Sequence, residues 1–531
     1  MSTASPVAYM QAFRQAFRQA FPPAAFGYGV TRLVKNRKNV LFIVIDQFRA
    51  DCLAGAFGNH VPLSNLRGFM AEAVTFNNHV SVTSPCGPAR ASLLTGQYAM
   101  NHRSVRNGTP LPHDKPNLAI EARKAGYLPL LYGYTDTTMD PRIFDAGDPM
   151  LHSYEQVMPG FVEALEMRLE ESWPWRAHLE AKGYKVPGYP EIFRPAGDRP
   201  DSPALYRTED SDTAFLTDRV ISELFARPKG WFGHVTYIRP HPPFVAPEPY
   251  NRLIDPGSLP PAKLIADESS EHPYLAPARA DQPIASTLIG FPDLGPTDEN
   301  IAMIRAIYLG LAAEVDHHFG RILEALKSAG LYEDTIVVVS GDHGEMLGDY
   351  GLWGKHSYHD AAFRVPLIIR DPNRNTLAGK ALDLPSESVD VAPTLLDMIG
   401  ADIPDTMDGV NLVPLLEGET PEGWRHYTYS ELEFGNPIYA SLAQKELGLS
   451  CGESNLAVIR DERYNLVHFN GGLPPLLFDM AGERETRDIS REPGSQDIVL
   501  RLTQAMLDHR MTHTEGRFSR TMVMPKGVVR K

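Results

Sequence analysis

The chain has 531 residues, of which 43% are hydrophobic and 22% are charged, and its formal net charge at pH 7 is −15. These values fit an ordinary globular protein of about two domains, and the negative charge argues against nucleic acid as the main partner. A local group of cations could still bind a small anionic substrate. The three cysteines, Cys52, Cys86 and Cys451, are too few and too scattered for a disulfide framework or a zinc ribbon, which favours a reducing compartment.

Residues 1–38 contain six basic residues and no acidic residue. Phe13, Phe17 and Phe21 recur every four positions and would line one side of a helix that ends at the following proline pair. We expect an arm that packs on a neighbouring subunit or an unstructured leader, ahead of a helix on a membrane surface. No run of the sequence is long enough to span a membrane and no signal peptide is recognisable, so we expect a cytoplasmic protein without a membrane partner.

Four apolar runs predict strands that are buried on both faces, as in a parallel sheet covered by helices. The runs are residues 39–46, 231–239, 335–343 and 365–369. Polar residues follow each run, as expected where strands deliver ligands at their carboxyl ends. Helical patterns lie between the runs, and the clearest covers residues 298–328, where apolar residues recur every three or four positions. This alternation predicts an α/β sandwich over residues 39–420.

The second half of the sequence contains two further features. Residues 250–296 are rich in Pro, Ala, Ser and Asp and weakly periodic, so we expect a long surface insertion. The run 418–423 is a plausible domain boundary. The elements expected after it are short strands at 456–459 and 464–469 and a helix near 495–510. They predict a smaller α+β domain with an antiparallel sheet over residues 421–531.

Two of the predicted strands end in dipeptides that could bind a metal ion. Asp46-Gln47 closes the first strand, and Asp342-His343 closes a later one. Because the carboxyl ends of parallel strands meet at one edge of the sheet, the four side chains can converge, although either dipeptide alone could simply cap its strand. Oxygen ligands alone would favour Ca²⁺, whereas an imidazole and an amide move the preference toward a transition ion. We therefore expect one divalent cation, Mn²⁺ ahead of Ca²⁺ or Zn²⁺.

Cys86 lies in the sequence Ser84-Pro85-Cys86-Gly87-Pro88-Ala89-Arg90, which continues into Ala91-Ser92-Leu93-Leu94-Thr95-Gly96. A cysteine with a proline two positions on and an arginine four positions on, before a short helix, is the signature of the sulfatases. The chain resembles the formylglycine-dependent sulfatases of the alkaline phosphatase superfamily over residues 39 to about 515, and among them it looks most like the phosphonate monoester hydrolases. The other segments that carry the resemblance are Asp46-Gln47, Asn101-His102-Arg103 through Asn107, Gly133-Tyr134-Thr135, Arg239-Pro240-His241-Pro242-Pro243-Phe244, Asp342-His343-Gly344-Glu345 with Gly354-Lys355, and Leu473-Pro474-Pro475-Leu476-Leu477-Phe478-Asp479.

The resemblance implies an alkaline-phosphatase-like α/β/α sandwich with a large mixed sheet, followed by the smaller domain. It also implies that a formylglycine-generating enzyme oxidises Cys86 to formylglycine, an aldehyde whose hydrate is the nucleophile. Arg90 lies one helical turn beyond Cys86, where it would hold the hydrate and neutralise substrate charge. His241 and Lys355 would contact the ester and help the leaving oxygen, as acid or cation.

Asn107 and Tyr134 would make polar contacts to the substrate or to the hydrate. In the implied mechanism, a cation held by the four predicted ligands lowers the pKa of one hydroxyl of the hydrate, and that oxygen displaces the alcohol from sulfur or phosphorus. The second hydroxyl then loses its proton and expels the bound sulfate or phosphonate, which regenerates the aldehyde. No water has to attack the central atom.

Typical sulfatases carry a Gly-Lys-Trp-His-Leu-Gly segment after the nucleophile motif. The corresponding stretch here is Tyr132-Gly133-Tyr134-Thr135-Asp136-Thr137, which matches the phosphonate monoester hydrolases except that Asp136 stands where that group tends to carry a threonine. We therefore expect a hydrolase of phosphonate monoesters, phosphodiesters and sulfate esters, and the related hydrolases suggest a homotetramer. The alternative is a narrower sulfatase acting on aryl or choline sulfate. A more distant alternative is a phosphoryl transferase, but such an enzyme would be expected to use Thr or Ser with zinc, and Cys86 in this motif counts against it. A non-enzymatic alternative is a metal-binding protein without turnover, in which Cys86 is left unmodified.

Overall fold

The computed structural model describes residues 37–531, apart from 171, 267–270, 375, 483, 517–518, 520, 526 and 531. The arm predicted at residues 1–38 therefore falls almost wholly outside the described residues. The apolar run after it forms strand β1 (Asn39–Ile45), whose alternate side chains enter two different hydrophobic clusters. Because successive residues of a strand point to opposite faces, an uninterrupted apolar run is what a strand covered on both faces requires.

The large sheet of the described chain has eight strands in the order β5-β4-β6-β1-β7-β8-β2-β9. The strands are β1, β2 (Val74–Phe76), β4 (Pro129–Gly133), β5 (Val162–Glu166), β6 (Phe232–Tyr237), β7 (Thr335–Gly341), β8 (Leu367–Arg370) and β9 (Ala381–Leu382). The five strands from β5 to β7 run parallel, β8 is antiparallel to both of its neighbours, and β9 is parallel to β2. The prediction of a large mixed sheet is confirmed.

The run 365–369 was expected to deliver polar residues to the same edge as the other predicted strands, and this prediction is wrong. β8 runs antiparallel to β7, with Arg370 opposite Val337 and Leu367 opposite Ser340. The carboxyl end of β8 therefore lies at the opposite edge of the sheet from Gly341, the last residue of β7. An apolar run predicts burial on both faces but carries no information about strand direction.

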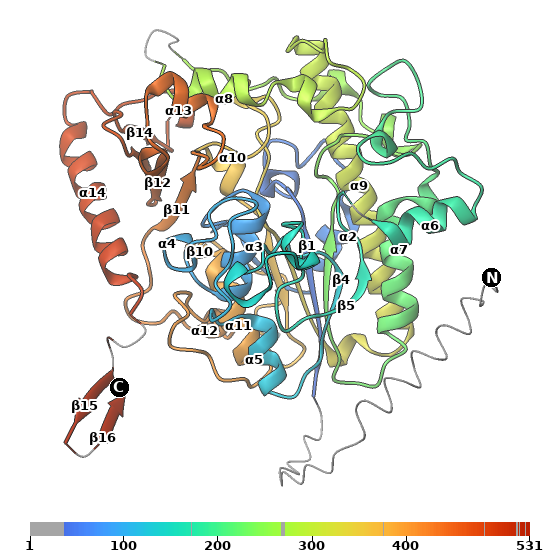
Figure 1. Ribbon diagram of the computed structural model, residues 1–531, viewed down its shortest axis with the longest axis horizontal. Coiled ribbons are helices and arrows are strands. Elements are labelled where there is room, and N and C mark those ends of the chain that lie inside the picture. Colours follow the sequence, from blue (N-terminus) through green and yellow to red (C-terminus); the bar gives the residue numbers. More distant parts are fainter. Residues whose placement is uncertain are drawn as a thin grey trace. The chain divides into compact units, whose positions relative to one another are not determined.

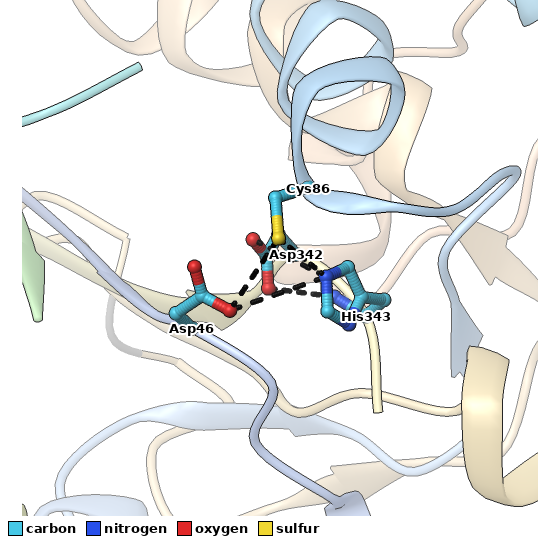
Figure 2. Close-up of side chains that lie close together, drawn as sticks. All are labelled: Asp46, Cys86, Asp342 and His343. Carbon is cyan, nitrogen blue, oxygen red and sulfur yellow. Dashed lines mark hydrogen bonds and ion pairs between the residues drawn. The ribbon is translucent and has the colours of Figure 1, made fainter. Parts of the chain in front are cut away.

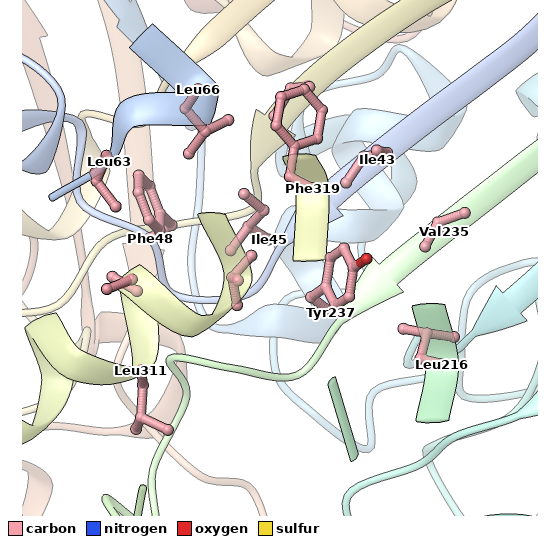
Figure 3. Packing of buried hydrophobic residues seen from close by; sticks show 14 of the residues in the cluster. Ile43, Ile45, Phe48, Leu63, Leu66, Leu216, Val235, Tyr237, Leu311 and Phe319 are labelled. Carbon is pink, nitrogen blue, oxygen red and sulfur yellow. The ribbon is translucent and has the colours of Figure 1, made fainter. Parts of the chain in front are cut away.

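Helices cover both faces of the sheet (Figure 1), and Figure 3 shows the packing on one of these faces. The first cluster joins Ile43 and Ile45 of β1 to α2 (Ser64–Met70), α7 (Asp212–Arg219) and α9 (Asp298–Ser328). The second joins the other face of β1 to α3 (Cys86–Thr95), α5 (Leu118–Lys124) and α11 (Val391–Met398). Two covered faces make the predicted α/β/α sandwich. The remaining α-helices of the described chain are α4 (Ala99–His102), α6 (Trp173–Ala181), α8 (Leu275–Asp281), α10 (Asp360–Phe363), α12 (Val413–Leu416), α13 (Leu442–Leu447) and α14 (Ser495–Thr512).

The segment 250–296 is more than a surface insertion. It contains α8, and Tyr274 and Leu275 are buried in a hydrophobic cluster with Leu432, Leu456 and Phe469 of the C-terminal part. The Tyr274 hydroxyl donates a hydrogen bond to the carbonyl of His356, 3.0 Å away. The segment therefore supports the loop that carries Lys355. Two adjacent buried residues give no periodic signal, so the sequence pattern did not predict this packing.

The C-terminal part contains a four-stranded antiparallel sheet in the order β11-β12-β13-β14. Its strands are β11 (Thr428–Glu433), β12 (Asn455–Arg460), β13 (Tyr464–Phe469) and β14 (Leu476–Asp479). Leu502 and Met506 of α14 pack on its apolar face. Two short pairs complete the described strands: β3 (His79–Val80) with β10 (Ser386–Glu387), and β15 (Thr521–Met524) with β16 (Gly527–Arg530). The smaller domain with an antiparallel sheet is confirmed, whereas its boundary at residue 421 stays a prediction.

No helix among the described residues combines the length and the apolar character that crossing a bilayer requires.

Candidate active site

The two dipeptides predicted to meet at the sheet edge do meet. β1 and β7 are parallel neighbours with Ile45 opposite Gly341, so Asp46 and Asp342 both follow directly at the carboxyl edge. The backbone N–H of Gln47 donates to the Asp342 carboxylate over 3.0 Å, and the N–H of His343 donates to the same oxygen over 2.8 Å. The register of two adjacent strands therefore fixes the position of all four side chains.

Cys86 completes a buried cluster at this edge, shown in Figure 2. One ligand atom each of Asp46, Cys86, Asp342 and His343 lies within 4.8 Å of the others. Cys86 is the first residue of α3, and its Sγ atom marks where oxygen would be attached after oxidation to the aldehyde. The Nε2 atom of His343 lies 3.1 Å from Sγ, and an Asp46 carboxylate oxygen lies 3.9 Å from it.

Arg90 lies one turn further along α3 and joins the two aspartates. Its guanidinium donates to Asp342 and to Asp46, each over 3.0 Å, and its exposed fraction is only 1%. The guanidinium also stacks over the ring of Tyr134, 4.2 Å from its centroid, and donates to the carbonyl of Tyr134. Arg90 thus holds the predicted ligands, and among the described contacts it makes no hydrogen bond to Cys86.

Tyr134 lies immediately after β4 and also acts on a predicted ligand. Its hydroxyl donates a hydrogen bond to Asp46 and lies 3.2 Å from Arg90. The structure places the hydroxyl against the carboxylate beside Cys86, and the polar contact to substrate or hydrate stays a prediction. The hydrogen bond from Tyr134 fixes one Asp46 oxygen and leaves the other facing the thiol.

Gln47 has a left-handed backbone conformation, with φ of 60°, which non-glycine residues seldom adopt. The side-chain amide of Gln47 donates to Glu345, while its oxygen accepts a hydrogen bond of 2.7 Å from Lys355. Glu345 in turn accepts backbone N–H groups from Leu347 and Gly354. Glu345 was recognised only as part of a motif, because an acid three residues after a predicted ligand carries no sequence signal of this orienting role.

Lys355 and His241 approach Cys86 from two separate loops. The Lys355 ammonium lies 3.2 Å from Sγ and 3.0 Å from Nε2 of His241. Lys355 is held in place by Gln47, and Ser84 donates to its carbonyl. The structure therefore brings both predicted leaving-group residues to one side of the nucleophile position.

Asn107 and Asp136 lie on the other side, around the start of α3. The Asn107 side chain accepts the backbone N–H of Gly87 over 2.9 Å, which satisfies one of the free donors at the helix N-terminus. Asp136 is 6% exposed, has φ of 47°, and lies 3.8 Å from the Arg90 guanidinium. A carbon atom added to Gly87 would lie 3.0 Å from the Asp136 carbonyl, so this position has no room for a side chain.

Burial and mutual repulsion set the electrostatics of the cluster. Burial, together with the charge of Asp342, raises the pKa of Asp46 to about 6. Burial also raises the pKa of the Cys86 thiol far above its ordinary value, and the Asp46 carboxylate adds to this shift. The same burial lowers the pKa of His343 to about 3, so its imidazole is neutral. An unmodified Cys86 would thus be a neutral thiol, which is a poor nucleophile.

The residues present fit a divalent cation. Two buried carboxylates at close range carry more negative charge than their surroundings favour, and a neutral imidazole lies beside them. Carboxylate, amide and imidazole donors together suit a cation of intermediate hardness. The predicted amide ligand, Gln47, comes from the same strand end as Asp46 and is bonded to Lys355 through its oxygen.

Comparison with known proteins agrees with this arrangement. The protein-family model described as Sulfatase matches residues 38–401, and the one described as N-sulphoglucosamine sulphohydrolase, C-terminal, matches residues 348–512. The chain is 38% identical over 513 residues to the multifunctional alkaline phosphatase superfamily protein PehA of Trinickia caryophylli, in a match that covers 93% of this chain and 99% of the relative.

Two solved structures are similar over nearly their whole length. The phosphonate monoester hydrolase SpPMH from Silicibacter pomeroyi is 50% identical, with a TM-score of 0.91 and coverage of 93% of this chain and 99% of that one. The phosphonate monoester hydrolase of Agrobacterium radiobacter is 38% identical, with a TM-score of 0.85 and coverage of 93% and 100%.

The fold and the buried cluster define a hydrolase of the alkaline phosphatase superfamily. Within that superfamily, the chain belongs to the sulfatase family. Membership implies a divalent metal and a formylglycine formed from the cysteine at the centre of the cluster.

Proposed function

We propose that the protein hydrolyses phosphonate monoesters, phosphodiesters and sulfate esters by covalent attack of the hydrated aldehyde at position 86. The observation that supports this best is the surroundings of the Cys86 Sγ atom. This atom lies 3.1 Å from the neutral imidazole of His343, 3.2 Å from the ammonium group of Lys355 and 3.9 Å from the carboxylate of Asp46. The names of the relatives with 50% and 38% identity favour phosphonate monoesters as the first substrates to test.

The residues around position 86 would have different roles in this reaction. Arg90 and Tyr134 hold Asp46 beside the nucleophile, and Arg90 also holds Asp342. Lys355 is positioned to neutralise charge on the transferred group. His241, which contacts Lys355, would lie beside the leaving oxygen and assist its departure. Asn107 fixes the start of α3 and thereby the direction of residue 86.

We propose Mn²⁺ as the cation, held by Asp46, Gln47, Asp342 and His343, with Ca²⁺ and Zn²⁺ as alternatives. The mixed donor set supports this choice, because an all-oxygen set would favour Ca²⁺ and a set richer in nitrogen or sulfur would favour Zn²⁺. When bound, the cation would supply Lewis acidity and neutralise the two carboxylates. Metal analysis of the purified protein, with activity measured after chelation and readdition of each ion, tests the choice.

The test of the reaction compares an aryl phenylphosphonate, an aryl phosphodiester and an aryl sulfate that share one leaving group. We expect turnover of all three, with the phosphonate and the diester ahead of the sulfate. Turnover of the sulfate ester alone, or of choline sulfate, would favour the narrower sulfatase. Mass spectrometry of the peptide that contains residue 86 should show the aldehyde, which is lighter than the thiol.

Maturation and assembly follow as further proposals. Cys86 is 4% exposed in the folded chain, so a formylglycine-generating enzyme would have to act before folding is complete. We also propose a homotetramer located in the cytoplasm, with a small anionic ester as the substrate and neither nucleic acid nor a membrane as a partner. Light scattering of the purified protein tests the tetramer, and cell fractionation tests the compartment.

A further inference from the structure

Arg239 is a fully buried cation that donates hydrogen bonds to the loop carrying His241. It lies two residues beyond the end of β6, whose last residue, Tyr237, is labelled in Figure 3, and its exposed fraction is 0%. One guanidinium nitrogen, Nη1, donates to the carbonyl of His241 over 3.1 Å and to the carbonyl of Pro243 over 2.9 Å. The backbone at His241 and two residues beyond it is therefore held by one rigid, planar group.

Arg239 is itself oriented by groups from two other elements. Its Nε atom donates to the Asp212 carboxylate over 3.0 Å, and Asp212 is the first residue of α7. The ring of Phe193 lies below the guanidinium, with 4.5 Å between the ring centroid and Cζ. Burial lowers the pKa of Arg239, but the charge of Asp212 contributes to raising it above its ordinary value. The guanidinium is therefore charged and fixed in direction.

A buried ion pair of this kind is weak evidence for stability. Removing two charges from water costs several kcal/mol per ion, and apolar residues of similar size often stabilise a fold equally well. The bonds from Arg239 are directional: Nε donates to Asp212, and Nη1 donates to two loop carbonyls. An apolar side chain could fill the space but could not hold those carbonyls at a fixed distance from α7.

The loop needs such a constraint because the imidazole of His241 must be held in one orientation. The Nε2 atom of His241 lies 3.0 Å from Lys355 Nζ, and Nδ1 contacts the carbonyl of Pro242. A group that assists a leaving oxygen loses effect when it is displaced by a fraction of an ångström, because proton transfer and charge stabilisation require contact distance. His241 has no further side-chain partner in the described part of the chain, so its direction depends on the backbone that Arg239 holds.

We propose that Arg239 is a positioning residue for His241, and that Asp212 orients Arg239. The inference rests on the proposed function, in which His241 serves the leaving oxygen. Its signature is a dependence on the leaving group. An acidic leaving phenol departs without help, whereas a weakly acidic one needs the proton or positive charge of Lys355, whose ammonium group contacts His241. Loosening the loop should therefore impair poor leaving groups and spare good ones.

The experiment measures kcat/KM for a series of aryl phenylphosphonates whose leaving phenols range from acidic to weakly acidic. For Arg239→Lys we expect a loss of about 100-fold with the least acidic phenol and less than about 5-fold with the most acidic one, because general acid help is worth about 10²–10⁴-fold. His241→Ala should show the same trend with a larger loss. Adding Arg239→Lys to His241→Ala should change little further, since the two act through one group.

Arg370→Lys is the matched control. Arg370 is also largely buried, stacks over an aromatic ring with Cζ 3.8 Å from the centroid of Tyr332, and donates to the carbonyl of Tyr332 and to Glu333. It lies at the opposite edge of the sheet, so its substitution should leave the leaving-group dependence unchanged. If Arg239→Lys fails to fold, Asp212→Asn keeps both carbonyl bonds of Arg239 and should show the same trend with a smaller loss.

An equal loss across the whole series, or full additivity with His241→Ala, would overturn the positioning role while leaving the proposed function intact. Absence of turnover by the wild-type protein, with formylglycine present and metal supplied, would overturn the proposed function and this inference with it.

Discussion

Two buried clusters of charged side chains differ in their balance of charge. At the site, Arg90 is shared by Asp46 and Asp342, with Asp136 3.8 Å from its Nε atom. Lys355 brings a second positive charge, but three carboxyl groups still face two cations. Burial and the charge of Asp342 raise the pKa of Asp46 to about 6, so the negative charge of Asp46 is disfavoured. Burial also acts to raise the pKa of Asp342, but neighbouring charges, including that of Arg90, hold it below its ordinary value.

The second cluster is balanced, because Arg49 also pairs with Asp51 over 2.6 Å and two carboxylates therefore face two guanidinium groups. Asp349 is bound by Arg49 over 3.2 Å and by Arg305 over 2.7 Å, and all three are buried. Burial alone would raise the pKa of Asp349, but the two guanidinium groups hold it below its ordinary value. This cluster is complete without a ligand, whereas the first has negative charge left for a cation. Substitutions that remove one negative charge should therefore have opposite consequences in the two regions.

The largest expected effect concerns the nucleophile. Cys86→Ala removes the atom that becomes the aldehyde, so we expect turnover to fall by about 10⁴-fold or more. The fold and the metal content should remain, because the ligand side chains and Arg90 are held by one another. Steady-state kinetics with metal analysis of the same sample checks this. Activity within about tenfold of the wild type would contradict covalent catalysis at position 86.

The comparison of the two clusters is tested directly by two matched substitutions in the metal-free protein. Asp349→Asn leaves two buried guanidinium groups without their shared carboxylate, and we expect the free energy of unfolding to fall by about 3–5 kcal/mol. Asp46→Asn removes a charge that the fold disfavours, so stability should stay the same or rise, although activity is lost. Urea denaturation measures both. A loss with Asp46→Asn as large as that with Asp349→Asn would show that the clusters do not differ in this way.

The parts of this arrangement that could be predicted from the sequence are those with a local signature. Asp46-Gln47 and Asp342-His343 each end an apolar run, and parallel neighbours bring such ends together. Cys86 and Arg90 belong to a contiguous motif on one helix. The predicted long helix has the bounds of α9, since its periodicity extends over many turns.

The parts that could not be predicted depend on contacts between distant segments. Nothing in the sequence near Arg239 indicates that its partner is Asp212, because the pair forms only when α7 packs beside β6. The direction of β8 and the burial of Tyr274 are likewise tertiary properties. Tyr134 was recognised as part of the site, but its contact with Asp46 depends on the order of strands in the sheet.

A smaller effect is expected from metal binding. Adding Mn²⁺ to the metal-free protein should stabilise it by about 2.7 kcal/mol at a free concentration one hundred times the Kd. The charge comparison predicts that this gain is largely lost in Asp46→Asn, because one ligand and one negative charge are gone, and retained in Asp349→Asn. Thermal denaturation with and without the ion measures the gain. Equal gains in the wild type and in Asp46→Asn would place the ion elsewhere.

The smallest expected effect concerns Glu314, a fully buried acid on α9 outside both clusters. Burial, with a contribution from Asp212, raises its pKa from 4.5 to about 8. Between these values the folded protein keeps a proton that the unfolded chain releases, so the stability contributed by the neutral acid is lost as pH rises from 4.5 to 8. Glu314→Gln cannot ionise, and its advantage over the wild type should therefore grow across this window, by up to about 1.4 kcal/mol for each pH unit.

The control for this last measurement is Glu324→Gln, which removes an exposed acid from the same helix. Thermal denaturation at several pH values compares the two variants with the wild type. Glu324→Gln should run parallel to the wild type because an exposed carboxylate is equally solvated in both states. A constant difference between Glu314→Gln and the wild type from pH 5 to pH 8.5 would contradict the raised pKa. It would also mean that Glu314 is ionised in the folded protein. The charge of Arg239, the residue proposed to position His241, would then stabilise the Glu314 carboxylate.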